Sequence, residues 1–163
     1  MSSERGATAI EILPPGPGRG SAAEAVLREL PGWFGIEEAT RAYIAQADAG
    51  PTWIAVDPTR DGQAVGFLTL ARHSPEAAEI IVMGVLPGLH RSGVGRRLVE
   101  AAEASLRTES VRFLQVKTLS DQDPDEGYAR TRAFYHALGF VLLEELPDLW
   151  GPGNPCSLLV KRL

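Results

Sequence analysis

The sequence predicts one α+β domain, and three observations lead to that class. Three strand-like runs, at 52–56, 63–72 and 77–86, follow one another with no helix between them. A helix, a strand, a second helix and two strands follow, and no linker or internal repeat divides the 163 residues. A doubly wound nucleotide-binding sheet would alternate strands with helices from its start, so the pattern disfavours that class.

The individual elements follow from apolar periodicity and from the residues that interrupt it. Residues 1–6 are expected to be frayed. In chain order we expect strand 8–13, helices 21–30 and 36–49, strands 52–56, 63–72 and 77–86, helix 93–108, strand 112–118, helix 128–138, and strands 140–146 and 155–160. The prediction therefore contains seven strands and four helices.

Local signals place the ends of the first helix. Ser21 is expected to cap it through its hydroxyl, with Glu24 as the partner in a capping box. Pro31 and Gly32 stop it, and the Pro- and Gly-rich run 14–20 is expected to end the preceding strand.

Composition and charge disfavour several classes of function. Sixteen Lys and Arg against 21 Asp and Glu give a net charge of -5, which offers no general attraction for nucleic acid and favours a cationic or neutral small partner. The longest apolar run, 80–86, is far shorter than the roughly 20 residues that span a bilayer. Because Cys156 is the single cysteine and the histidines have no zinc-like spacing, we expect no disulfide, no metal and a cytoplasmic location. A homodimer stays an open alternative.

The segment 85–106 is the most informative one, because an apolar strand leads through a short loop into an amphipathic helix. The first turn of a helix presents unpaired backbone N–H groups, and Gly93 and Gly95 carry no side chain to block an anion. Three arginines lie within seven residues there: Arg91, Arg96 and Arg97. We therefore expect a diphosphate site, the alternative being a tight turn with a solvated basic face. Neither the complete Rossmann fingerprint nor a Walker motif is present.

Residues 90–95, HRSGVG, resemble the Q/R-x-x-G-x-G/A signature of the GNAT superfamily of N-acetyltransferases. His90 departs from the family's Gln or Arg, and Arg91 beside it supplies a charge. A second match, YARTRAFYHALGF at 128–140, is similar to the family's A-x-x-F-Y-x-x-x-G-F segment. The resemblance spans roughly 52–140. It implies a mixed central sheet of about seven strands with about four helices and a V-shaped splay between strands 4 and 5.

The resemblance implies acetyl-CoA as the acetyl donor. Backbone N–H groups of residues 91–96 would hold its diphosphate, and its pantetheine arm would pair with 83–85 like an added strand. Gly84 suits a bulge or a close backbone approach there, and a simple packing need is the alternative. The cofactor-binding residues expected are Met83, Gly84, Val85, His90, Arg91, Ser92, Gly93, Val94, Gly95, Arg96, Phe134 and Tyr135.

Acetyl transfer to an amine needs a base, an oxyanion donor and an acid. Tyr135 matches the family position whose phenol protonates the departing thiolate, the alternative being a packed helix tyrosine. Glu79 resembles the glutamate with which the histone-acetylating branch deprotonates the amine directly or through water, the alternative being a solvated carboxylate at a strand end. The backbone N–H of Val85 is the implied oxyanion donor.

In this family the amine acceptor lies mainly against the first two helices and their connecting loop. Trp33 and Phe34 could wall a pocket there, and Glu37 or Glu38 could attract an ammonium group, the alternative being a hydrophobic staple ahead of the second helix. Tyr128 lies seven residues before Tyr135 on nearly the same helix face and is the remaining expected substrate-binding residue. Trp150 is expected either at the pocket or in a dimer contact.

The loop after the fifth strand departs from the family, which often has an Asn there. This chain offers Thr118, Ser120 and Gln122 instead, followed by an acidic run at 121–126 that either faces a cationic acceptor or is simply solvated.

The expected function is therefore acetyl transfer from acetyl-CoA to a primary amine by direct attack within a ternary complex. The acceptor is a small molecule or a peptide amine, and the sequence does not distinguish these. The alternatives are a catalytically silent CoA-binding or regulatory module of the same fold, an ATP-binding protein that uses the same loop, and a structural or partner-binding role for the exposed aromatic residues.

Overall fold

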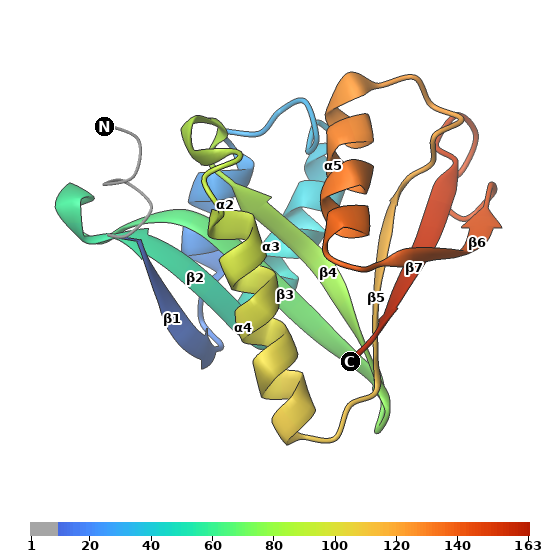
Figure 1. Cartoon of the computed structure of the whole chain (residues 1–163). Coiled ribbons are helices and arrows are strands. Elements are labelled where there is room, and N and C mark those ends of the chain that lie inside the picture. The colour runs from blue at the N-terminus through green and yellow to red at the C-terminus, as the bar shows by residue number, and fades with distance from the viewer. Residues whose placement is uncertain (1–9) are drawn as a thin grey trace. The chain divides into compact units, whose positions relative to one another are not determined.

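The computed structural model describes residues 10–163, in which seven strands and four α-helices are found (Figure 1). The elements are β1 (Glu11–Gly16), α2 (Gly20–Leu27), α3 (Glu37–Ala49), β2 (Thr52–Asp57), β3 (Gln63–Ser74), β4 (Ala77–Val85), α4 (Val94–Thr108), β5 (Phe113–Leu119), α5 (Glu126–Ala137), β6 (Val141–Leu146) and β7 (Cys156–Arg162). The frayed segment 1–6 and the first two residues of the expected strand 8–13 lie outside the described residues.

The strands form one mixed sheet in the order β1-β2-β3-β4-β5-β7-β6. β1 with β2, β2 with β3, β5 with β7 and β6 with β7 are antiparallel, whereas β4 and β5 are parallel. This confirms the predicted α+β class with an antiparallel half and a β-α-β half. The parallel ladder joins Ala77–Ile80 to residues 113–116 and ends there, although β4 continues to Val85.

The chain divides into two compact units. Unit 1 contains the described residues up to Ala71 together with Ile81–Ser105, and unit 2 contains Arg72–Ile80 and Leu106–Leu163. β3, β4 and α4 each contribute residues to both units. The single-domain organisation stays a prediction.

The core of unit 1 lies between α2 and the strands β2, β3 and β4. Val26 and Leu27 of α2 are buried there with Ile54, Phe67 and Val82, and no solvent reaches Phe67. The predicted helix therefore forms because its apolar side has a sheet to cover.

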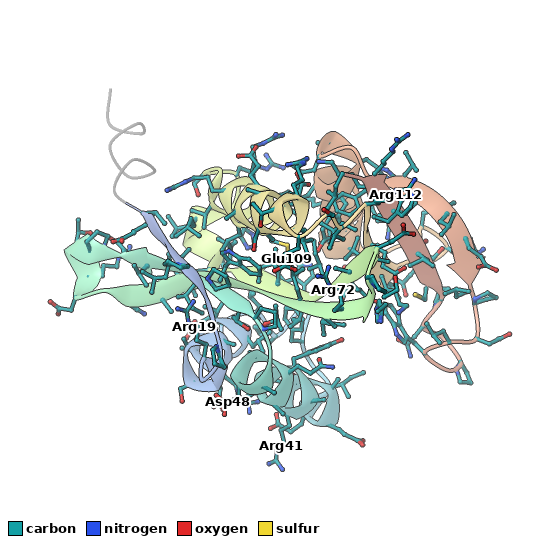
Figure 2. All side chains as sticks on the ribbon, turned by 90° about the horizontal axis from the view of Figure 1, so that it is seen from below. Arg19, Arg41, Asp48, Arg72, Glu109 and Arg112 are labelled. Carbon is teal, nitrogen blue, oxygen red and sulfur yellow. The ribbon has the colours of Figure 1, made fainter. Side chains whose placement is uncertain are left out.

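The start of α2 differs from the expected capping box. Ser21 lies inside the helix, which begins at Gly20, and the Gly20 N–H donates to Asp48 Oδ1 of α3 at 2.9 Å. Arg19 donates to the Thr52 carbonyl at 2.6 Å; Arg19 and Asp48 are labelled in Figure 2. The expectation was wrong because α3 supplies the acceptor that a local serine would otherwise provide.

β1 also differs from expectation, because it continues through Pro14 and Pro15 to Gly16. Its pairing with β2 becomes irregular between Leu13 and Gly16. β1 is an edge strand, where a proline without an N–H costs no ladder hydrogen bond on the open side.

Unit 2 is built around β5, whose residues alternate between the two faces of the sheet. Leu114, Val116 and Thr118 are buried on one face, whereas Gln115 and Lys117 project from the other. At the surface of unit 2, Arg72 and Glu109 form an ion pair in which a terminal guanidinium nitrogen lies 2.5 Å from a carboxylate oxygen (Figure 2).

The acidic run 121–126 begins α5 two residues earlier than expected. Asp125 is the N-cap, and its carboxylate accepts from the Tyr128 N–H at 2.9 Å. Asp123 accepts from the Asp125 N–H at 2.9 Å. Two of the carboxylates therefore hold the backbone at the helix start.

Between residues 10 and 163, no helix has the length and apolar character that crossing a bilayer requires.

Candidate active site

The loop between β4 and α4 is shaped by a 3₁₀ turn at Pro87–Leu89 and by two residues with left-handed backbone conformation. These are Arg91 at φ 63° and Gly93 at φ 89°. A Cβ at Gly93 would meet nothing within 4 Å, so backbone conformation rather than space explains this glycine. α4 then begins at Val94, whose side chain is buried.

The start of α4 presents free backbone donors. Among the described residues, the first amide after Ser92 with a backbone acceptor is that of Arg97, which donates to the Gly93 carbonyl at 3.0 Å. The N–H groups of residues 93–96 have none there. Arg91 and Arg96 are exposed beside them, Arg96 lying 3.6 Å from Glu100. Four amides at the positive end of a 15-residue helix, with two exposed guanidinium groups, are an arrangement that can bind an anion.

His90, which departs from the family signature, contacts the end of β4 and a tryptophan ring. Its Nε2 lies 2.7 Å from the Val85 carbonyl oxygen, and its ring meets Trp33 edge-on with centroids 5.6 Å apart. The peptide that follows Val85 is also held on its other side, because the Leu86 N–H donates to the Val65 carbonyl at 2.9 Å. His90 therefore links the end of β4 to the loop between α2 and α3, which the sequence did not predict.

The end of β4 packs into the core of unit 1. A Cβ at Gly84 would lie 2.9 Å from Leu30 Cδ1 and 3.4 Å from both Phe67 Cε1 and Val26 Cγ1. Of the two explanations that the sequence left open, packing accounts for this glycine without any ligand. Met83 is half-buried and Val85 is buried.

The expected acceptor residues of unit 1 have different surroundings. Trp33 and Phe34 are half-buried, Trp33 against His90 and Phe34 edge-on to Tyr43 at 5.9 Å. The acidic residues Glu37 and Glu38 are both exposed in the first turn of α3.

Glu37 is already paired with two arginines. Its carboxylate accepts hydrogen bonds from the two Nη atoms of Arg28 and from Nε of Arg41, and these partners lower its pKa to about 2. Arg41 projects away from α3 in Figure 2. Glu38 has no such partner among the described residues, so it is the carboxylate still available to a cation.

Glu79 is buried in unit 2, which overturns the alternative of a solvated strand-end carboxylate. Its Oε1 accepts from Gln115 Nε2 at 2.7 Å and from Lys117 Nζ at 3.0 Å, and it lies 2.8 Å from His73 Nε2. Burial acts to raise the pKa of the Glu79 carboxyl, but the hydrogen bonds from these three side chains outweigh it, and the net change is downward. The carboxylate is therefore held in its charged form.

Tyr135 is buried in α5 of unit 2, between two phenylalanines. Its ring meets Phe134 and Phe140 edge-on at 5.2 and 5.5 Å, and its hydroxyl has no hydrogen-bond partner within residues 10–163. Burial raises the pKa of the phenol, and the neighbouring Tyr128 adds to this effect. The phenol thus stays protonated at neutral pH. Phe134 and Tyr128 are half-buried.

One polar atom of β5 is buried without a partner. The Thr118 side chain is 3% exposed, and its Oγ1 has no hydrogen-bond partner in the described part of the chain. Such an orphaned hydroxyl costs stability unless another molecule satisfies it. Thr118 lies in the segment in which the family often has an Asn and this chain does not.

A hollow of about 300 Å³ in unit 2 is bordered by one residue of the acidic run, Asp121, and by no other predicted site residue. It is lined by Asp121, Ala129, Arg132, Ala133, His136, Leu142, Glu145, Ser157 and Leu159.

Comparison with known proteins agrees with these features. Residues 40–142 match the family model described as an acetyltransferase (GNAT) domain, and this span includes β4, the glycine loop and α5. The chain belongs to the GNAT acetyltransferase family. A segment of 59 residues is 41% identical to an uncharacterized N-acetyltransferase of Chlorobaculum tepidum, covering 36% of this chain and 38% of that relative's length.

Solved structures of GNAT proteins have the same fold at low identity. A GNAT-family protein from Desulfovibrio desulfuricans is 19% identical with a TM-score of 0.75, covering 94% of this chain and 99% of that one. The ribosomal-protein-S18-alanine N-acetyltransferase of Escherichia coli is 16% identical, with a TM-score of 0.71 over 94% and 93%. An aminoglycoside 6′-N-acetyltransferase complexed with coenzyme A is also 16% identical, with a TM-score of 0.71 over 93% and 96%.

The predicted residues of this GNAT chain fall into both units. In unit 1 the structure joins Trp33 to His90, and in unit 2 it brings Tyr128 near Tyr135. Sequence reasoning missed His73, Gln115 and Lys117 around Glu79. The alternation of polar and apolar residues in β5 was a signal that Gln115 and Lys117 share one face of the strand. That both contact Glu79 depends on the register between strands, which this alternation does not determine.

Proposed function

We propose that the protein transfers the acetyl group of acetyl-CoA to a primary amine by direct attack within a ternary complex. The observation that carries the proposal is the row of free N–H groups at 93–96 beside exposed arginines, because a diphosphate needs this arrangement. The residues present fit acetyl-CoA. Gly93 leaves its surroundings open, and the orphaned Thr118 Oγ1 offers a hydroxyl to a polar ligand.

Residues of unit 1 would hold the donor. The amides of 91–96, with Arg91 and Arg96, would bind the diphosphate, while Met83, Gly84 and Val85 would pair with the pantetheine arm. His90 would keep the loop in place through its bond to the Val85 carbonyl. The Val85 N–H would stabilise the negative charge that develops on the thioester oxygen.

Residues of unit 2 would handle the protons. Tyr135, whose raised pKa keeps it protonated, would donate to the departing CoA thiolate, with Phe134 beside the donor arm. Glu79 would supply the negative charge needed to deprotonate the amine, directly or through an intermediary. Its buried, fully hydrogen-bonded position supports an electrostatic role.

In unit 1 the acceptor would contact the aromatic rings of Trp33 and Phe34 and the free carboxylate of Glu38. In unit 2, Tyr128 is the residue proposed to bind the acceptor. Glu37 is the weaker candidate because its charge is already neutralised by Arg28 and Arg41. An aromatic wall beside a carboxylate favours an ammonium group. The S18-alanine and aminoglycoside enzymes named above make a peptide N-terminus and an amino sugar reasonable first acceptors to try.

Thermal unfolding with acetyl-CoA, CoA, ATP and NAD at matched concentrations tests the donor. A ligand at one hundred times its Kd adds about 2.7 kcal/mol. For a chain of this size we expect a Tm increase of about 5 to 10 °C with acetyl-CoA and CoA only. An equal shift with ATP or NAD would contradict the assignment of the glycine loop.

Release of CoA thiol, followed with a thiol reagent, then tests the acceptor. The three probes are kanamycin, an alanine-initiated peptide and phenethylamine. Mass spectrometry of the product would show whether an alcohol group had been O-acetylated instead of the amine. Binding of acetyl-CoA without turnover on any amine would favour the silent CoA-binding module instead.

A further inference from the structure

The carboxylate of Glu79 is more heavily hydrogen-bonded than a proton acceptor should be. Oε1 takes donors from Gln115 at 2.7 Å and Lys117 at 3.0 Å, with His73 Nε2 at 2.8 Å, and Oε2 lies 3.3 Å from Lys117. Protonating this group would remove the charge that the Lys117 ammonium faces. The geometry therefore makes Glu79 a fixed anion rather than the group that takes the substrate's proton.

His73 is placed differently from its partner. Its side chain is 45% exposed, whereas that of Glu79 is 7% exposed. Because Nε2 faces a carboxylate, the neutral form of the ring places its hydrogen on Nε2, and Nδ1 then has a lone pair. Nδ1 has no hydrogen-bond partner among residues 10–163. The accessible basic atom of the cluster is thus on His73.

The other groups around this pair come from two strands. Lys117 and Gln115 of β5 contact Glu79 directly, and the Cys156 thiol of β7 interacts electrostatically with both Glu79 and Lys117. Burial raises the pKa of the Cys156 thiol to about 11, so it stays neutral. The groups that face His73 and Glu79 are therefore the Lys117 side chain, the Gln115 amide and the Cys156 thiol.

We propose that His73 and Glu79 act as a dyad, in which His73 Nδ1 takes the proton of the incoming ammonium group and Glu79 stabilises the imidazolium through Nε2. This rests on the proposed acetyl transfer. It assigns the proton-accepting atom to a residue that the family resemblance does not indicate. In such a dyad a buried carboxylate orients the histidine ring and stabilises the imidazolium that forms.

The protons balance as follows in the proposed reaction. The ammonium group loses one proton to His73 Nδ1, and the free amine attacks the thioester carbon. When the C–S bond breaks, Tyr135 gives its proton to the sulfur, and the second amine proton, lost as the amide forms, returns to Tyr135 through solvent. His73 releases its proton to water, so one proton leaves per turnover.

His73→Ala tests the dyad, because an exposed side chain is removed. We expect kcat/KM at pH 7 to fall about 100-fold or more, with the acetyl-CoA-induced Tm shift unchanged. The remaining rate should rise about tenfold per pH unit, since only the free amine then reacts. Added imidazole should restore much of the rate, which a purely structural role for His73 would not allow.

Two further variants complete the design. Glu79→Gln should lower the rate at pH 7 and should not respond to imidazole, because the imidazole of His73 is still present. His136→Ala removes another exposed histidine of unit 2, which bonds the Phe140 carbonyl, and should leave both rate and imidazole response unchanged.

The outcomes separate the two proposals. His73→Ala with wild-type rates and an unchanged pH profile overturns the dyad while leaving acetyl transfer intact. Full activity of Glu79→Gln overturns it as well. A wild-type chain that binds acetyl-CoA but is inactive on all three amines overturns both the transfer and the dyad.

Discussion

Gly84→Ala is the substitution whose effect the structure defines most closely. The new Cβ would lie 2.9 Å from Leu30 Cδ1 and 3.4 Å from Phe67 Cε1 and Val26 Cγ1, whereas carbon atoms prefer about 3.5 to 4.0 Å. Overpacking of this kind costs about 1 to 3 kcal/mol. The end of the Leu30 side chain can shift, and replacing Gly by Ala restricts the unfolded chain by about 0.4 to 1 kcal/mol. The net loss should be about 1 kcal/mol.

Urea unfolding of the variant measures this loss directly, and a Tm lower by about 2 to 4 °C should accompany it. Gly88→Ala is the matched control, because its Cβ would meet nothing within 4 Å, and its stability should equal or exceed that of the wild type. Leu30→Ala combined with Gly84→Ala should be less destabilised than the two single losses added together, by about 1 kcal/mol.

The same variant separates the two explanations for Gly84. If packing alone requires the glycine, Gly84→Ala keeps the wild-type Tm increase with acetyl-CoA. If the pantetheine arm needs the space, that increase shrinks. An unfolding free energy within about 0.5 kcal/mol of the wild type, with no coupling to Leu30, would refute the packing argument.

Four further predictions concern the remaining site residues. Tyr135→Phe should lower kcat by about 100-fold or more while keeping the acetyl-CoA-induced Tm shift, because only the acid is removed; steady-state kinetics would contradict the acid role if turnover were unchanged. Gly93→Ala should weaken acetyl-CoA binding in calorimetry by about tenfold, because φ 89° strains any residue with a Cβ. The folded pKa of Glu79 lies below its ordinary value of 4.5, so its contribution to stability is present above about pH 4.5 and is lost as pH falls through the folded pKa. Glu79→Gln should therefore flatten the slope of unfolding free energy below about pH 4.5, and an unchanged slope would contradict the cluster. Cys156, buried with its pKa raised to about 11, should react slowly with a thiol reagent until the chain is denatured.

Much of the fold follows from local patterns in the sequence. Alternation over 63–72 and 77–86 and helical spacing over 36–49 predicted β3, β4 and α3 within two residues, because each pattern depends on neighbours a few positions away. The failures have the opposite cause. Ser21 did not cap α2 because Asp48, 28 residues after Gly20, accepts the hydrogen bond from the Gly20 N–H. β1 continues through two prolines because it is an edge strand.

The sequence by itself determined the elements, the glycine loop and the candidate acid, since spacing along one segment encodes each of them. Only the tertiary structure decided what surrounds the catalytic candidates. His73 and Lys117 reach Glu79 from β3 and β5, across 6 and 38 residues of sequence. His90 meets Trp33 from a different loop. Such contacts depend on strand register and loop geometry, which arise from the free energy of the whole packed chain rather than from any local window.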